Sequence, residues 1–268
     1  MITAKTSKEL HDMLEDRTDK AIELTSGNYD LEFDERVTMN LRAANPLHTN
    51  IYLHKTLNPS YFSFLSRVTL VPVGHIAAVN LDKSSYTELD SVIFNSAVHP
   101  KRLQENNVSE TWNSFDREGV GIETTGDNIG DDAYGISIRG CLFQTLVKGI
   151  SLGFPKEKGT VAWDLERNVF NGCYNGLAGT RVGELRMRGG IVQLAAIGIV
   201  LDDSRSNWLS QIHFERSDLD IYLGQDTCYN QLLWNDAPLH KIYDKGYFNR
   251  VKVMRHRNVD RPCKKQAD

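Results

Sequence analysis

Several kinds of sequence feature are missing from this chain of 268 residues, and each absence excludes a class of protein. No run of about 18 apolar residues exists and the N-terminus has no apolar core of signal-peptide length, so we expect no membrane span and synthesis in the cytoplasm. The net charge of −4 argues against binding nucleic acid through phosphate neutralisation. No dinucleotide-binding, phosphate-loop or metalloprotease motif occurs, so no cofactor is expected.

Cysteine is scarce and poorly placed for chemistry. The four cysteines show no Cys-x-x-Cys spacing and no histidine partners at zinc-site distances, which argues against a zinc site. Four thiols in a chain this long also do not suit a secreted disulfide scaffold. The cysteines are Cys141, Cys173, Cys228 and Cys263.

What the chain does contain is a repeat, between Gly121 and Val253. One series of phrases aligns at Gly121, Gly149, Gly176, Gly198, Asp220 and Lys241, each followed by apolar residues, with steps of 28, 27, 22, 22 and 21 residues. A second series lies between these phrases and closes at Phe143, Phe170, Val192 and Phe214, with steps of 27, 22 and 22 residues. Two interleaved series that share a period predict a repeat architecture.

The phrases of both series predict strands. They are short, they alternate apolar with polar residues, and Gly, Asn and Asp separate them. The regular Leu-x-x-Leu-x-Leu frame of leucine-rich repeats is absent. A parallel β-solenoid remains, a single domain of about nine or ten coils in which like residues stack about 4.8 Å apart.

The chain resembles the right-handed parallel β-helix proteins of the pectin-lyase-like superfamily. The resemblance rests on the Gly-Ile-x-Leu phrases, on the strand and turn from Asn168 to Gly172, and on the opening Ala21–Tyr29, in which an apolar strand enters a Gly-x-Tyr turn. It covers about residues 6–256. It implies an all-β, single-stranded right-handed parallel β-helix and specifies fold better than activity.

Three segments are expected along the chain: residues 1–20 with a capping helix, a β-helix over 21–256, and a basic tail over 257–268. The helix is predicted over residues 6–17 because Thr6 and Glu9 form a capping box ahead of an apolar stripe. It would cover the open edge of the first coil. Earlier strands are predicted at Val37–Leu41, Asn50–Leu53, Val68–Val73, Ala77–Leu81 and Leu89–Phe94. Residues 99–118 are the most polar stretch and predict a loop.

Stacking of the coils predicts a charged surface patch. Six residues before the second-series closing positions stand Ser137, Asp164, Arg186 and Trp208, and four residues before them stand Arg139, Glu166, Arg188 and Ser210. All eight should point outward, because the residues between them are apolar. Arginine side chains bind carboxylates or sulfates through paired hydrogen bonds, and an exposed indole can pack against the apolar face of a sugar ring.

Two roles are open for this patch. The carboxylates Asp164 and Glu166, with Arg188, are candidate catalytic groups for cleaving a glycan, while Arg139, Arg186 and Trp208 would bind it. The structural alternative is a ladder of ion pairs between neighbouring strands. In this ladder Glu166 would pair with Arg139 and with Arg188, and Asp164 would pair with Arg186.

A second candidate site follows a later strand. Asp202 and Asp203, with His213 and Glu215 one strand on, resemble the adjacent carboxylates of polygalacturonases. The Gly-His-Gly and Arg-x-Lys motifs of those enzymes are absent, and ordinary turn chemistry explains the two aspartates.

Calcium is the one ion that the sequence suggests, because Asp127, Asp131 and Asp132 make an oxygen-rich segment. Turns between coils explain these residues equally well. Tyr222 and Tyr243, one coil apart, are expected to stack on an outer face and to serve a sugar or a subunit interface.

The sequence therefore predicts a carbohydrate-recognising β-helix. Within the resembling families, one candidate is a virion component of the phage tail-spike type, commonly a homotrimer, which binds a polysaccharide or cell-surface glycan and has depolymerase activity as an option. The alternatives are a polysaccharide lyase or glycoside hydrolase acting on an acidic polysaccharide, and a purely structural or protein-interaction solenoid.

Overall fold

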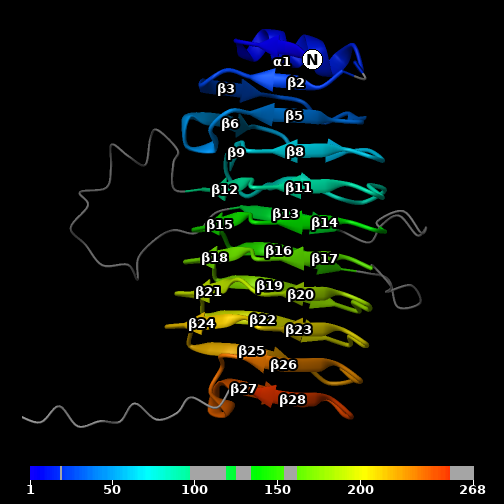
Figure 1. Cartoon of the computed structure of the whole chain (residues 1–268), viewed down its shortest axis with the longest axis vertical. Helices are drawn as coiled ribbons and strands as arrows, with labels where there is room; N and C mark the ends of the chain where they lie inside the picture. Colours follow the sequence, from blue (N-terminus) through cyan, green and yellow to red (C-terminus); the bar gives the residue numbers. More distant parts are fainter. Residues whose placement is uncertain (19, 97–118, 125–133, 154–161, 254–268) are drawn as a thin grey trace, which may run out of the picture.

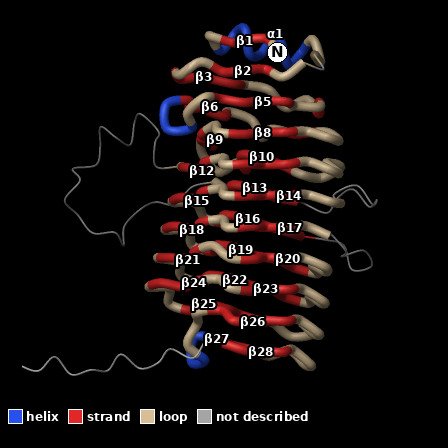
Figure 2. The backbone as a smooth tube through the Cα atoms, in the orientation of Figure 1, coloured by secondary structure: helices blue, strands red, loops and turns tan. Residues whose placement is uncertain are grey.

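The chain winds into a single stack of coils (Figures 1 and 2), seen here in a computed structural model. The structure describes all residues except 19, 97–118, 125–133, 154–161 and 254–268. All of the strand pairs are parallel, and each strand pairs with the equivalent strand of the next coil. The expected fold, a right-handed parallel β-helix, is confirmed.

Three long sheets run the length of the stack. The first sheet has eleven strands: β1 (Ile2–Ala4), β2 (Ile22–Leu24), β5 (Asn40–Ala43), β8 (Phe64–Ser66), β11 (Glu88–Asp90), β14 (Ser137–Arg139), β17 (Asp164–Glu166), β20 (Arg186–Arg188), β23 (Trp208–Ser210), β26 (Gln231–Asn235) and β28 (Arg250–Val253). The second has eight: β3 (Gly27–Leu31), β6 (Thr49–Leu53), β9 (Thr69–Pro72), β12 (Ile93–Asn95), β15 (Leu142–Gln144), β18 (Val169–Asn171), β21 (Ile191–Gln193) and β24 (His213–Glu215).

The third sheet has seven strands: β10 (Ala77–Asn80), β13 (Val120–Thr124), β16 (Lys148–Gly153), β19 (Asn175–Thr180), β22 (Ile197–Asp202), β25 (Leu219–Leu223) and β27 (Ile242–Asp244). The remaining elements are the pair β4 (Arg36–Val37) and β7 (Asn58–Pro59), the helix α1 (Ser7–Glu15), and the 3-10 turns Pro46–His48 and Leu239–Lys241. In the part of the chain that is described, no helix is long and apolar enough to cross a membrane.

The N-terminal segment differs from the expectation in one respect. Helix α1 caps the stack as predicted, with Leu10 and Leu14 buried against the first coil. Its Thr6 hydroxyl accepts a hydrogen bond from the Glu9 backbone, while the Glu9 carboxylate accepts one from the backbone N–H of Lys5. However, β1 precedes the helix and pairs with β2, so the first coil begins before residue 21 and the first sheet exceeds ten strands.

The strand boundaries expected before residue 96 need correction in two places. The segment Leu89–Phe94 is two strands, β11 and β12, because Ser91 adopts a left-handed conformation (φ 57°) and turns the chain from the first sheet to the second. Likewise the segment Val37–Leu41 is divided between β4 and β5.

Stacked aromatic rings explain why the repeat begins with glycine. Phe143 stacks on Phe94 and on Phe170 with ring centroids 4.8 Å apart in both pairs. A Cβ atom at Gly149 would lie 2.5 Å from the ring of Phe170, and one at Gly121 would lie 2.8 Å from the ring of Phe143. Each glycine therefore leaves space for the phenylalanine of the next coil.

Polar side chains also stack inside the coil. Asn207 donates a hydrogen bond to the side chain of Asn230 (2.9 Å), which donates to Asn249 (3.0 Å). The Oδ1 of Asn207 accepts from the backbone of Leu185 (3.0 Å). This ladder satisfies buried backbone groups at the turns and needs no functional explanation.

Asp220 takes the glycine position in the coil where no further second-sheet strand follows β24. Burial raises the pKa of this carboxyl to about 6, against the weaker opposing effect of Lys241 and His240. The unfolded carboxyl has an ordinary pKa of about 3.9. The folded state therefore holds the proton more tightly, so the contribution of Asp220 to stability is fully present below about pH 4 and is lost as the pH rises through about 6.

We expect the Asp220→Asn variant to lose this pH dependence. Between pH 4.5 and pH 8, the difference in unfolding free energy between variant and parent should shift in favour of the variant by on the order of 1–3 kcal/mol. Denaturant unfolding of both proteins at the two pH values measures it. A difference that stays constant with pH would show that Asp220 does not titrate in this window.

Candidate functional site

The outer face of the first sheet carries two columns of side chains, as the repeat predicts. In the first column Ser137, Asp164, Arg186 and Trp208 lie on successive strands, and in the second Arg139, Glu166, Arg188 and Ser210 do the same. The residues between them, such as Leu165 and Met187, are buried in the core. We call Arg139, Asp164, Glu166, Arg186, Arg188 and Trp208 the charged patch.

The patch side chains differ in how far they reach water. Arg139, Arg186, Arg188 and Trp208 are exposed, the last at 46%. The two carboxylate residues are half-buried. Ser210 was expected to point outward with the others; it holds that register, but it is buried, with Arg188 and Leu233 as its neighbours in the column.

The ion pairs of the patch follow the predicted ladder only in part. Glu166 pairs with Arg188 on the next coil (3.1 Å) and with Arg167 in the adjoining turn (3.8 Å). Arg139 pairs with Glu88 on the preceding coil (3.8 Å). The predicted pairs of Arg139 with Glu166 and of Asp164 with Arg186 are not among the ion pairs of the described residues.

This arrangement separates the arginines by role. The guanidinium of Arg188 donates a hydrogen bond to the carboxylate of Glu166 on the preceding coil (3.1 Å). Arg186 is exposed and makes no ion pair with any described residue, and Trp208 lies next to it on the following strand. An unpaired guanidinium beside an exposed indole can bind an anionic group and a ring at once.

The repeat in the sequence did not predict that the two columns continue beyond Ser137 and Arg139 at one end and beyond Trp208 and Ser210 at the other. Glu88 and Asp90 extend them toward the N-terminus, and Gln231, Arg250 and Lys252 extend them toward the C-terminus. Charge therefore changes along this face, from acidic on β11 to basic on β20 and β28. Counting outward positions forward from the Trp208 strand would have found the basic end.

The second candidate site is not assembled as the sequence suggested. Asp202 ends β22 in the third sheet and Asp203 occupies the following turn (φ 46°), whereas His213 and Glu215 lie on β24 in the second sheet. His213 instead shares a hydrogen bond of 2.5 Å with Asp236. The turn explanation of the two aspartates therefore agrees with the geometry.

Tyr222 and Tyr243 stack as expected, on the outer face of the third sheet. Their ring centroids lie 5.6 Å apart at an angle of 21°, and the ammonium group of Lys245 lies 5.3 Å from the centre of the Tyr243 ring. Tyr243 is exposed and Tyr222 half-buried. Since they lie on a different sheet from the charged patch, they would act as a separate contact.

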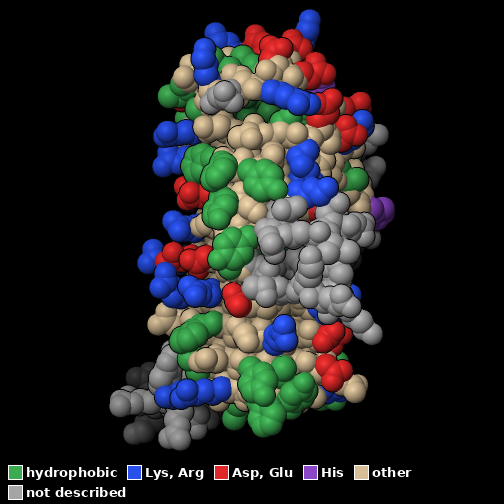
Figure 3. Space-filling model, turned by 90° about the vertical axis from the view of Figure 1, so that its right-hand side faces the viewer, with side chains coloured by type: hydrophobic (Ala, Val, Ile, Leu, Met, Phe, Trp, Pro, Cys, Tyr) green, Lys and Arg blue, Asp and Glu red, His purple; other side chains and the backbone are tan. Residues whose placement is uncertain are grey.

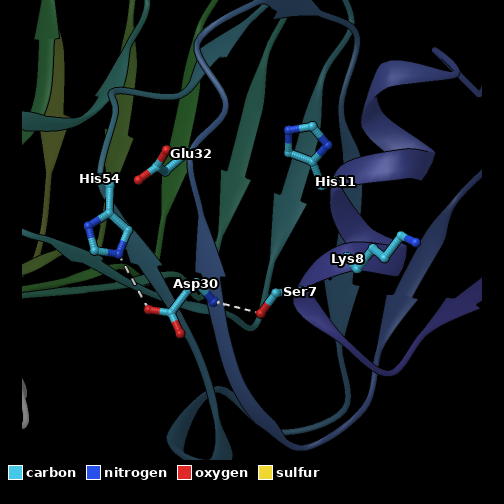
Figure 4. A pocket seen from close by; sticks show the side chains of 6 residues that line it. All are labelled: Ser7, Lys8, His11, Asp30, Glu32 and His54. Atoms are coloured by element: carbon cyan, nitrogen blue, oxygen red, sulfur yellow. Dashed lines mark hydrogen bonds and ion pairs between the residues drawn. The ribbon is translucent and has the colours of Figure 1, made fainter.

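A hollow beside helix α1 is a site that the sequence did not indicate (Figure 4). Its volume is about 400 Å³, and Ser7, Lys8, His11, Asp30, Glu32 and His54 line it. His54 pairs with Asp30 (3.4 Å), and the ligand atoms of His11, Asp12 and Glu15 lie within 4.8 Å of one another. These last three are the described residues best placed to hold a divalent cation, but all are solvent-accessible, and His11 already pairs with Glu15 (3.6 Å).

Several sequence expectations fall outside the described residues. They are the calcium candidates Asp127, Asp131 and Asp132, the whole polar stretch 99–118, and the basic tail. Calcium binding stays a prediction.

Comparisons with known proteins concern shape. No protein-family profile and no curated sequence matches the chain. An alginate lyase from Paenibacillus sp. is 10% identical, with 95% of this chain and 99% of that one covered and a TM-score of 0.46. A mannuronic acid specific family 6 lyase from human gut microbiota is 10% identical (95% and 83% covered, TM-score 0.44). The mannuronan C-5 epimerase AlgE4 A-module of Azotobacter vinelandii is 11% identical (87% and 78% covered, TM-score 0.42).

Likeness at this level of identity assigns neither an activity nor a residue role to this chain. The strand register of the chain itself defines its class, a parallel β-helix with a charged and aromatic lateral face.

Proposed function

We propose that the protein binds an acidic polysaccharide along the outer face of the first sheet. The observation that carries the proposal is the exposed guanidinium of Arg186, which has no ion-pair partner among the described residues, beside the exposed indole of Trp208 on the adjacent coil. Arg188 and Arg139 add positive charge on the same face. A guanidinium pairs with a carboxylate or sulfate through two parallel hydrogen bonds, and the indole covers the apolar face of a sugar ring.

A depolymerase activity is the finer part of this proposal. Asp164 and Glu166 lie two residues apart on β17 and both face outward, so both could approach one glycosidic linkage. Since Glu166 is already paired with Arg188, Asp164 is the better candidate to move a proton, and Glu166 would position the arginine. A tail-spike-type virion role and a homotrimer stay predictions, to be tested by measuring the mass of the assembly.

The test is incubation of the purified protein with a panel of acidic and neutral polysaccharides, with and without calcium. Retention on an acidic polymer is the expected result for the binding proposal. Shortened chains with new ultraviolet absorbance would establish a lyase, and shortened chains without it a hydrolase. Failure to bind any acidic polymer, with the fold intact by circular dichroism, would refute the proposal.

If cleavage occurs, we expect Asp164→Asn to abolish it, lowering the rate at least 100-fold while binding is retained. Glu166→Gln should weaken both cleavage and binding, because it releases Arg188. Full cleavage by the Asp164→Asn protein would remove that residue from the catalytic account.

A further inference from the structure

Several turn positions of the coil have a left-handed backbone, and one of them also carries large, exposed side chains. It lies two residues before each strand of the first sheet from β8 to β28, and in every coil its backbone is left-handed, with φ between 42° and 68°. We call this set the corner column: Phe62, Tyr86, Gly135, Ala162, Glu184, Ser206, Tyr229 and Phe248. Glycine adopts this conformation without strain, yet only one of the eight is glycine.

Four of the eight residues are aromatic, and an aromatic residue at this position costs folding free energy for two reasons. Bulky side chains are strained in a left-handed backbone, and these rings are left in water, from 55% exposed for Tyr86 to 73% for Phe248. They stack in two pairs, Phe62 on Tyr86 (5.3 Å) and Tyr229 on Phe248 (5.4 Å). Strain and exposure together at one site indicate a function beyond the turn.

The two aromatic pairs have different surroundings. At the N-terminal pair, the ring of Tyr86 lies over Gly135, where an added Cβ would be 3.2 Å from it, and Tyr134 packs against its edge. At the C-terminal pair, the position next to Tyr229 holds the short side chain of Ser206, and a pocket of about 490 Å³ opens there. Figure 3 looks onto these turns and shows hydrophobic side chains gathered in two separate groups along the corner.

The pocket combines aromatic walls with polar groups of both charges. Its lining residues are Gly183, Glu184, Arg205, Ser206, Cys228, Tyr229 and Tyr247. Arg205 and Glu184 are exposed and form no ion pair with a described residue, although they lie on adjacent coils. The volume lies within the range of small-molecule sites. Tyrosine rings, an exposed guanidinium and hydroxyl acceptors suit a sugar ring that carries a carboxylate.

We propose that this pocket binds one carboxylated sugar residue, with its ring on Tyr229 and its carboxylate on Arg205. Glu184 and Ser206 would then bond the sugar hydroxyls. The pocket adjoins the charged patch, because Glu184 and Ser206 precede Arg186 and Trp208 by two residues, about 7 Å of extended chain. The pocket proposal rests on the proposed function in one respect: the glycan that enters the pocket would continue onto the charged patch.

The test uses short probes, namely galacturonate, mannuronate and glucuronate trisaccharides, each beside its carboxyl-reduced counterpart. Binding to the full chain is measured by isothermal titration. The wild type is expected to bind at least one uronate at least tenfold more tightly than the reduced sugar. Tyr229→Gly and Arg205→Gln should each weaken that binding at least tenfold.

The matched control is Phe62→Gly, which removes an aromatic ring from the same turn position in a coil that lacks the pocket. It should leave the affinity within twofold of the wild type. Because glycine suits the left-handed backbone, both glycine variants should melt at or above the wild-type temperature, so a loss of binding cannot be ascribed to unfolding.

The outcomes separate the pocket from the patch. If Arg186→Glu weakens binding of an acidic polymer but Tyr229→Gly and Arg205→Gln do not change binding of any probe, the pocket inference is overturned and the proposed function stands. If no uronate probe and no acidic polymer binds the wild type, both are overturned.

Discussion

Replacing Phe143 by alanine is expected to lower the free energy of unfolding by about 3–5 kcal/mol. The ring is fully buried and lies between Phe94 and Phe170, so its removal opens a cavity that two neighbouring coils border. The stacked rings and the glycines beside them have fixed positions, and the backbone of the coils is held by the sheets, so the cavity cannot close by collapse.

Chemical denaturation followed by circular dichroism measures this loss. The control is Phe62→Ala, because Phe62 also stacks on an aromatic ring but lies exposed at a turn. We expect the control to cost less than about 1 kcal/mol, since it leaves no cavity. Equal effects of the two substitutions would show that ring stacking, and not burial in the coil, accounts for the stability.

Reversing the charge of Arg186 is the second large effect. The Arg186→Glu variant is expected to bind acidic polysaccharide at least tenfold more weakly than the wild type, about 1.4 kcal/mol or more. The substitution removes the one patch arginine that has no ion-pair partner among the described residues and places a carboxylate next to Asp164. Because surface charges are screened by salt, the difference should shrink as the ionic strength rises.

The control for this variant is Arg42→Glu. Arg42 is an exposed outward residue of the same sheet, on β5, and its substitution changes the net charge of the protein by the same two units. It lies several coils from Arg186 in the strand order. If both variants weaken binding equally, then overall charge and not the patch determines affinity.

The sequence was informative wherever one residue type recurs with the coil. The glycine and phenylalanine columns pack against one another, so their spacing predicts the register of all three sheets from β14 to β24, and with it the neighbours in the charged patch. The short N-terminal strand β1 carries no such marker. The long step between β12 and β13 hid the alignment of Glu88 with Ser137, and therefore the pairing of Arg139 with Glu88.

The site could be predicted only to the level of the columns. Which arginine pairs with which carboxylate depends on side-chain rotamers, and on turn residues such as Arg167 that the repeat does not specify. The corner column could not be predicted from the sequence, because its left-handed backbone recurs in each coil while its residue type changes. Similarly, Asp202 and His213 are close in sequence, but the chain turns from the third sheet through the first to the second between them.

The central claim is that the lateral face recognises the acidic groups of a glycan. The most direct test is to titrate the protein with a uronate polymer and with the same polymer after its carboxyl groups have been reduced to alcohols. We expect the acidic polymer to bind at least tenfold more tightly, with an affinity that falls as salt is added. Equal affinity for the two polymers, or no binding of either, would contradict the claim.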